Sequence, residues 1–165
     1  MGRIGRAFAK RARAFDMEIH YHNPHRLEPH LEQGAQYHAN IRSLFQNVSF
    51  LSLNATATES TQHILNARSL QLLPHGAIIV NTARGDLVDD DALINALKNG
   101  RIAAAGLDVY TGEPRIHPDY LKLKSVFLLP HLGSATIETR NAMGFKAIDN
   151  LDAFFAGDEP PDRIV

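Results

Sequence analysis

The sequence of 165 residues contains no cysteine, which excludes disulfide bonds, thiolate zinc sites and a cysteine nucleophile. No apolar run reaches the roughly 20 residues of a membrane-spanning helix, and the N-terminus lacks the apolar segment of a signal peptide. Neither charge sign dominates, since the formal net charge is -1. This balance excludes a global basic field that would attract nucleic acid or an anionic membrane. We therefore expect a cytoplasmic enzyme or binding domain without nucleic-acid or membrane partners.

What the sequence does contain is an alternation of strand-like and helix-like segments. The strand-like runs are 17–22, 48–54, 77–83, 102–109 and 125–131, and the helix-like segments are 2–15, 24–35, 66–73, 89–100 and 134–157. Such alternation predicts parallel strands joined by crossover helices, and thus an α/β fold with a Rossmann-type doubly wound parallel sheet. Ligands of such sheets bind at the carboxyl ends of the strands. The residues that follow each strand are therefore the candidates for a functional site.

The N-terminal stretch GRIG has the glycine spacing of a phosphate-binding turn. Gly2 and Gly5 would let the backbone approach a pyrophosphate, and the helix that follows would offer unpaired N–H groups and the positive end of its dipole. The same glycines are also compatible with a helix start that simply tolerates glycine. This stretch alone does not decide between the two interpretations.

About 20 residues further on, a dinucleotide-binding fold places the residue that contacts the adenosine ribose. Asn23 occupies this place, and His25 and Arg26 follow it. An acidic residue here would bind the ribose hydroxyls and repel a 2′-phosphate, whereas a neutral residue beside a cation suits a 2′-phosphate. These residues favour NADP over NAD. The alternative is that His25 and Arg26 merely lie on a surface turn.

Several of the nine histidines crowd the segment 20–38. His20 and His22 would share one face of a strand, a pattern that can indicate a metal site. No acidic or cysteine residue stands nearby at convincing ligand spacing. We expect scattered surface or edge-strand histidines here, and no metal site.

Three residues with complementary chemistry follow the later strands. Arg84, in NTARGDL, could hold a carboxylate with its guanidinium, and His131, in LLPHLGS, could exchange a proton near neutral pH. Glu113, in DVYTGEP, could orient the imidazole and favour its protonated form. Reduction of a 2-oxo acid by a nicotinamide hydride needs this set. Each residue alone is better explained as a loop salt bridge or a cap, but three at successive strand ends favour the catalytic interpretation.

The stretches GRIGRAFAKRA, VNTARGDLVDDDAL, GRIAAAGLDVYTGEP and LLPHLGSATIETRNAM resemble the D-isomer-specific 2-hydroxyacid dehydrogenases, especially their glyoxylate and hydroxypyruvate reductase branch. The resemblance covers nearly the whole chain. It implies that Arg84, Glu113 and His131 are catalytic, that NADP or else NAD is the cofactor, and that a small 2-oxo or 2-hydroxy acid is the substrate. The implied cofactor contacts are Gly2, Arg3, Ile4, Gly5, Asn23, His25, Arg26, Asn54, Thr82, Ala83, Arg84, Asp108, His131, Gly133 and Ser134.

Members of this family have a strand and a further glycine before the position of Met1, and also a separate substrate domain. The resemblance therefore implies that residues 1–165 form an N-terminally truncated dinucleotide-binding domain without the substrate domain. The sheet would then lack its first, central strand, and we expect a homodimer that covers the uncovered surface. Two alternatives stay open: a dinucleotide-binding interaction module without catalysis, and an NAD-linked dehydrogenase of another acid, such as formate or phosphoglycerate.

Overall fold

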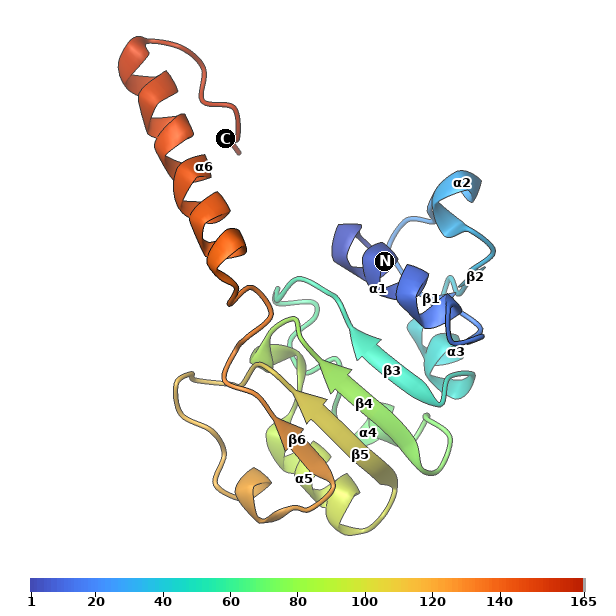
Figure 1. Ribbon diagram of the computed structural model, residues 1–165. Helices are drawn as coiled ribbons and strands as arrows, with labels where there is room; N and C mark the ends of the chain where they lie inside the picture. The colour runs from blue at the N-terminus through green and yellow to red at the C-terminus, as the bar shows by residue number, and fades with distance from the viewer. Residues whose placement is uncertain (165) are drawn as a thin grey trace. The chain divides into compact units, whose positions relative to one another are not determined.

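The structure is a computed structural model that describes residues 1–164. It divides into two units, Met1–Pro130 and His131–Val165. The first unit carries the strands and all but one of the helices, and the second unit carries one long helix (Figure 1).

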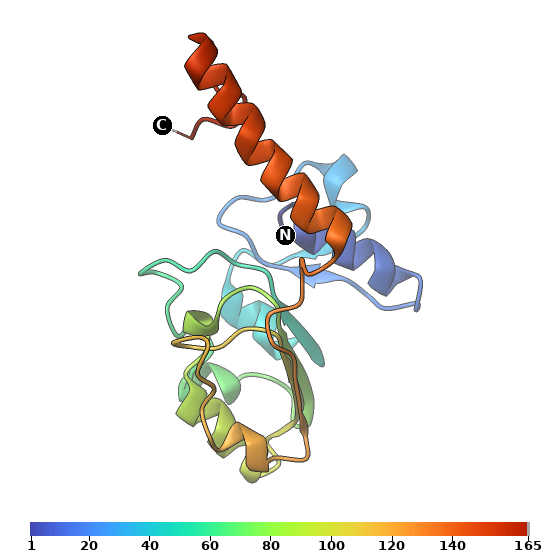
Figure 2. The same cartoon turned by 60° about the vertical axis from the view of Figure 1, so that its left-hand side comes forward.

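Four parallel strands form the main sheet of the first unit, in the order β3-β4-β5-β6. They are β3 (Phe50–Leu53), β4 (Ala77–Asn81), β5 (Ile102–Leu107) and β6 (Val126–Leu128). Helices α4 (Ala67–Leu70) and α5 (Asp90–Lys98) lie on the same face of this sheet (Figure 2). The sheet confirms the predicted parallel α/β fold, and its parallel strands bring their carboxyl ends to one edge.

A second, two-stranded parallel sheet consists of β1 (His20–Tyr21) and β2 (Gln36–Tyr37). Within residues 1–164, no hydrogen-bonded ladder joins β1 to β3. A doubly wound sheet places its first strand at the centre, between these two neighbours. The strands of residues 1–164 therefore form two separate parallel sheets, with β1 and β3 in different ones.

Side-chain caps fix the ends of the helices on the main sheet. The Asp89 carboxylate accepts a hydrogen bond from the Ala92 N–H at 3.1 Å and caps α5. Gly100 follows the other end of α5 with a φ of +75°, a conformation that glycine adopts without steric cost. Asn66 caps α4 and exchanges hydrogen bonds with Ser69. Both helices confirm the sequence pattern.

The predicted strand at 17–22 is too long at its start. Helix α1 (Arg3–Arg13) ends in a turn in which Asp16 has a φ of +58° and the Met17 N–H bonds to the Ala12 carbonyl at 3.3 Å. These residues complete the helix end, so the strand begins only at His20. The other predicted strands are likewise shortened by two to four residues in total, because their polar ends turn into loops.

The sequence pattern did not predict β2, helix α3 (Ile41–Gln46) or the two short 3-10 helices Gly85–Leu87 and Tyr120–Lys122. A strand of two residues is too short for a detectable alternation. Helix α3 did have a signal, since the Asn40 side chain caps it by accepting the Arg42 N–H at 2.8 Å. A further short helix, α2 (Pro29–Glu32), lies inside the predicted segment 24–35.

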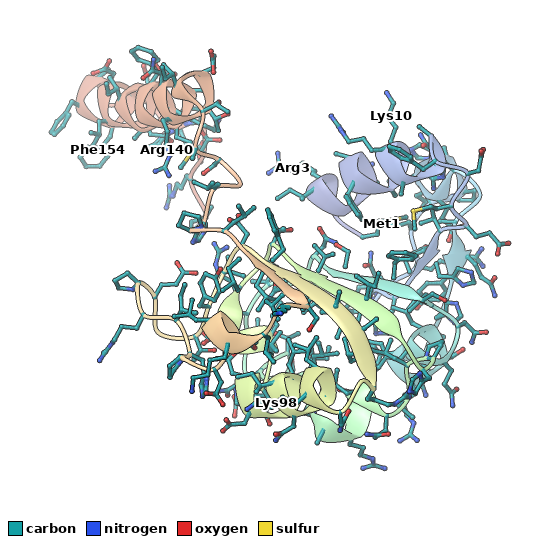
Figure 3. The ribbon with its side chains drawn as sticks, turned by 60° about the horizontal axis from the view of Figure 1, so that its bottom comes forward. Met1, Arg3, Lys10, Lys98, Arg140 and Phe154 are labelled. Atoms are coloured by element: carbon teal, nitrogen blue, oxygen red, sulfur yellow. The ribbon has the colours of Figure 1, made fainter. Side chains whose placement is uncertain are left out.

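In the second unit, α6 (Ile137–Ala156) confirms the predicted long helix. Thr136 caps its start, and Gly157 ends it with a φ of +84°. Every side chain of α6 is at least partly exposed, and Phe154 and Arg140 project from it in Figure 3. Its exposed apolar residues are Ile137, Met143, Phe145, Ile148, Leu151, Phe154 and Phe155. Over residues 1–164, none of the helices combines the length and apolarity needed to cross a membrane.

Candidate dinucleotide site and active-site loops

The N-terminus of α1 lies at the carboxyl ends of both β1 and β3. The Met1 amine donates a hydrogen bond to the side-chain oxygen of Asn23, which follows β1. A Cβ added to Gly5 would lie 3.7 Å from the Cβ of Asn54, which follows β3. Figure 3 shows Met1 and Arg3 at this end of the helix. The glycine turn is therefore beside the strand ends, where the sequence predicts a pyrophosphate.

The surroundings of this turn favour an anion. Gly2 caps α1 without a side-chain hydrogen bond, and the first turn carries no acidic residue. The Nε of Arg6 is buried and has no hydrogen-bond partner within residues 1–164. Burial, and then the Arg6 cation, lower the pKa of the Met1 amine. A helix start with exposed N–H groups and an unsatisfied guanidinium nitrogen fits a phosphate group.

Arg26 is held by a carboxylate rather than left open to the turn. Its Nε and a terminal nitrogen donate to the two oxygens of Glu32 at 2.8 and 3.1 Å. Its guanidinium also lies 5.8 Å from the centre of the Tyr37 ring. Hydrogen bonds from Arg26, and then from Tyr21, lower the pKa of Glu32. Binding of a 2′-phosphate by Arg26 stays a prediction, and Glu32 is its competitor.

The expectation of surface or edge-strand histidines fits His20 and His22 at the edge strand β1, but it is wrong for His38. His38 is buried, with 5% of its surface exposed, and its ring contacts His20. The His22 ring donates to the His38 carbonyl at 2.7 Å. The pairing of β1 with β2 brings the three residues together, and the sequence analysis missed it because it did not find β2.

The loop that carries Arg84 is fixed by a buried asparagine at the end of β4. The Asn81 side chain donates to the Arg84 carbonyl at 2.8 Å and accepts the Ala83 N–H at 3.0 Å. The Arg84 side chain is exposed and donates to the Ala83 carbonyl. Thr82 in the same loop is exposed as well. Asn81 thus positions the backbone on which the predicted carboxylate anchor sits.

Gly85 brings the Arg84 loop against the loop that carries Glu113. A Cβ at Gly85 would lie 2.0 Å from the carbonyl carbon of Tyr110 and 2.2 Å from the Thr111 nitrogen. No side chain fits at such a distance, so glycine is required for this backbone contact. The sequence analysis missed the roles of both Asn81 and Gly85. The motif NTARG contained the signal, because a glycine directly after a strand-end loop often marks a close backbone approach.

The loop after β5 is organised by Asp108, Tyr110 and Glu113. Asp108 is buried, and its N–H donates to the Asn81 carbonyl at 3.0 Å. The Glu113 carboxylate accepts the Tyr110 N–H at 2.9 Å. The Tyr110 hydroxyl lies within hydrogen-bonding distance of the Leu107 and Leu129 carbonyls, at 2.9 and 2.7 Å. Tyr110, which the sequence analysis also missed, therefore ties the ends of β5 and β6 together.

The remaining predicted residues belong to the start of the second unit. His131 is the third residue after β6 and has a φ of +56°, which is uncommon for any residue but glycine. Such strained conformations cluster at functional sites. Gly133 and Ser134 follow it. The contact of Glu113 with His131, and the cofactor contacts of the residues after Pro130, stay predictions.

The N-terminus of α1 and the loops after β1, β3, β4 and β5 lie at the carboxyl ends of parallel strands, and a glycine turn opens the helix. This combination defines a dinucleotide-binding α/β domain. Residues 1–133 match the D-isomer specific 2-hydroxyacid dehydrogenase family, NAD binding domain. The chain belongs to this family.

Three relatives illustrate the similarity. A glycerate dehydrogenase from Hyphomicrobium methylovorum is 46% identical over 94% of this chain and 49% of its own length. The crystal structure of a D-isomer specific 2-hydroxyacid dehydrogenase from Polaromonas has a TM-score of 0.97 at 45% identity, covering 100% of this chain and 52% of that one. An NADPH-dependent glyoxylate/hydroxypyruvate reductase from Sinorhizobium meliloti, solved with NADP and malonate, has a TM-score of 0.89 at 41% identity, covering 93% and 47%. The chain spans about half the length of these relatives.

Proposed function

We propose that this chain is the cofactor-binding part of an NAD(P)H-dependent reductase of small 2-oxo acids of the glyoxylate or hydroxypyruvate type. The observation that carries the proposal is the fixed loop after β4. Asn81 and Gly85 hold the backbone of Arg84 against the loop of Glu113, as a site for a carboxylate requires. A similar chain from Sinorhizobium meliloti is named a glyoxylate/hydroxypyruvate reductase, which supports this substrate class.

Each catalytic residue has one task in the proposed reaction. The guanidinium of Arg84 holds the substrate carboxylate and polarises the neighbouring carbonyl group. His131 gives a proton to the carbonyl oxygen, and Glu113 orients the imidazole and favours its protonated form. A bound nicotinamide supplies the hydride for the carbonyl carbon. With the proton on oxygen and the hydride on carbon, the product is the 2-hydroxy acid.

The cofactor is NAD or NADP, and we propose a preference for NADP. The support is the neutral residue Asn23 at the ribose position, with His25 and Arg26 behind it. The relative from Sinorhizobium meliloti was solved with NADP. The residues of the α1 turn would hold the pyrophosphate through their N–H groups.

We also propose that the chain associates as a homodimer. Strands β1 and β3 each have an edge that no described strand covers, and such edges favour pairing with another chain.

Enzyme kinetics test the proposal. Because this chain spans about half the length of its relatives, the assay needs a protein that also contains the other half. This chain is joined to the remaining half of the glycerate dehydrogenase from Hyphomicrobium methylovorum, and NADPH oxidation is followed with glyoxylate, hydroxypyruvate, formate and phosphohydroxypyruvate. Turnover of the first two supports the proposal. Turnover of only the last two identifies a dehydrogenase of another acid. A folded chimera that binds NADPH and reduces none of these acids identifies a binding module without catalysis.

A further inference from the structure

His38 is the buried centre of a chain of hydrogen bonds beside the candidate ribose site. Its Nε2 lies 2.9 Å from Nδ1 of His20 on β1, and its Nδ1 lies 2.9 Å from Oγ of Ser43 on α3. Its carbonyl oxygen accepts the Nδ1–H of His22 at 2.7 Å. One imidazole therefore fastens the end of β1 to α3.

The hydrogen bonds limit how many protons the three histidine rings can hold. His22 donates from Nδ1, because a carbonyl oxygen can only accept. The Ser43 hydroxyl can accept from or donate to Nδ1 of His38, and in either case the single N–H between His38 and His20 belongs to only one of the two rings. A proton on Nε2 of His20 leaves the hydrogen bond between His20 and His38 intact. This proton faces Glu18, whose carboxylate lies 3.9 Å away. The first proton that the pair binds is thus tolerated.

A second proton on the His20–His38 pair breaks the hydrogen bond between the two rings. Protonated His38 and His20 would present two N–H donors to each other at 2.9 Å, and the new charge would be buried. Burial, and then the positive charges of His20 and His22, lower the pKa of His38. Ser43 contacts His38 with a neutral hydroxyl, and the Glu18 carboxylate lies behind His20. The neighbouring elements also carry the exposed Arg42 on α3 and the Tyr37 hydroxyl on β2. The contact between β1 and α3 through His38, called the β1–α3 corner below, therefore needs the neutral imidazole of His38.

The end of β1 that His38 fastens leads directly to Asn23. The Tyr37 hydroxyl on β2 donates to the Asn23 carbonyl at 3.2 Å. On the opposite face of β1, the Tyr21 hydroxyl donates to Glu32, the partner of Arg26. The turn 23–26 is thus held by a strand pair whose attachment to α3 depends on His38.

We propose that neutral His38 is a positioning residue for the ribose-contacting turn at Asn23, and that its protonation releases this turn. The part that concerns the dinucleotide rests on the proposed function. The sign follows from linkage: a histidine that is neutral in the folded β1–α3 corner stabilises it fully above the ordinary pKa of about 6.5, and this stabilisation is lost as the pH falls below that value. Between pH 7.5 and 5.5, the equilibrium constant for the closed β1–α3 corner falls up to about tenfold.

Hydrogen–deuterium exchange on this chain tests the positioning role without any cofactor. The amide exchange rates of residues 19–23 and 36–38 are corrected for the intrinsic effect of pH. They should increase by as much as about tenfold when the pH falls from 7.5 to 5.5. In His38→Gln, whose amide still bonds but does not titrate, the rise should vanish. The exposed histidine in His75→Gln is the matched control and should leave the rise unchanged. An equal rise in the parent and in His38→Gln overturns the proposal.

Two further measurements cover the other outcomes. If His38→Gln does not fold, Ser43→Ala is used in its place. In this variant the exchange rates should be higher at both pH values, and they should still rise as the pH falls. Exchange rates equal to those of the parent overturn the proposal. Binding of NADH, which has no titrating 2′-phosphate, should weaken with acid in the parent and much less in His38→Gln. An equal loss in both overturns the proposal. Absence of binding of both NADH and NADPH at pH 7.5 contradicts the proposed function instead, and the exchange data still decide the role of His38.

Discussion

Arg84 combines an exposed side chain with a fixed backbone. The Asn81 amide holds its carbonyl, and the neighbouring Gly85 packs against Tyr110 at a distance that excludes any side chain. A guanidinium on such a loop can hold a carboxylate without a costly rearrangement of the backbone. This residue therefore gives the proposed chemistry its most direct test by mutation.

Replacement of Arg84 by alanine in the chimera should reduce kcat/KM for glyoxylate by about 10²–10³, the usual loss for one anion-stabilising donor. NADPH affinity should stay within a few-fold, because the α1 turn is unchanged. Steady-state kinetics and a fluorescence titration measure the two effects. Arg42→Ala, an exposed arginine on α3, is the control. A kcat/KM within a few-fold of the parent would remove Arg84 from the site.

Arg26 tests the choice of cofactor. The Arg26 side chain is 64% exposed and already bonded to Glu32, so its gain from a 2′-phosphate should lie at the low end of the range for a charged hydrogen bond. Arg26→Ala should therefore weaken NADPH relative to NADH about tenfold. Titration of both cofactors measures the ratio. Equal affinity of the parent protein for NADPH and NADH would contradict binding of the 2′-phosphate by Arg26.

Helix α5 shows how one side chain stabilises a whole element. The Asp89 carboxylate caps it, Asp90 and Asp91 complement the dipole in its first turn, and Leu93 and Ile94 are buried. Its position on the sheet supports the loop of Arg84, which immediately precedes it in the chain.

Asp89→Ala should lower the free energy of unfolding by about 1 kcal/mol, within the range of 0.5–2 for loss of an N-cap. Denaturation by urea, with an unchanged slope, measures this loss. Asp89→Asn is the matched control and should stay within a few tenths of a kcal/mol of the parent, since asparagine caps equally well. An equal loss in both variants would show that charge, and not the cap, stabilises α5.

The elements that the sequence predicted well are those with a cap, a clear period and a stop signal, such as α5 and α6. The parts that it missed are set by contacts distant in the sequence. The burial of His38 follows from the pairing of β1 with β2, and the need for Gly85 follows from its contact with Tyr110. The strand ends could be read as a site because parallel order places them together. The ion pair of Arg26 with Glu32 could not be predicted, because the sequence does not indicate how the segment between them folds.

At the scale of the whole molecule, we expect the break between β1 and β3 to affect how the chain behaves in solution. Both strands have uncovered edges, and apolar side chains are exposed on nearby elements of the first unit. Ile4 and Phe8 of α1 are 76% and 48% exposed, and Phe50 of β3 is 57% exposed. Unpaired edges beside apolar surface favour association.

The purified chain should therefore self-associate, most simply as a dimer, as measured by light scattering over a range of concentrations. Phe50→Lys at the β3 edge should shift the equilibrium toward the monomer, because a lysine on an edge strand opposes pairing. Leu121→Lys, an exposed apolar residue that lies on no strand, is the control and should leave the mass unchanged. A parent chain that stays monomeric at high concentration would refute this account of the break.

The central claim is that the α1 turn and the neighbouring strand ends bind a dinucleotide, and NMR chemical-shift mapping of this chain with NADPH tests it most directly. The account predicts saturable shifts at residues 2–5, 23–26, 54, 82–84 and 108, and unchanged signals in α5. Absence of saturable binding, or shifts confined to residues away from these strand ends, would contradict it.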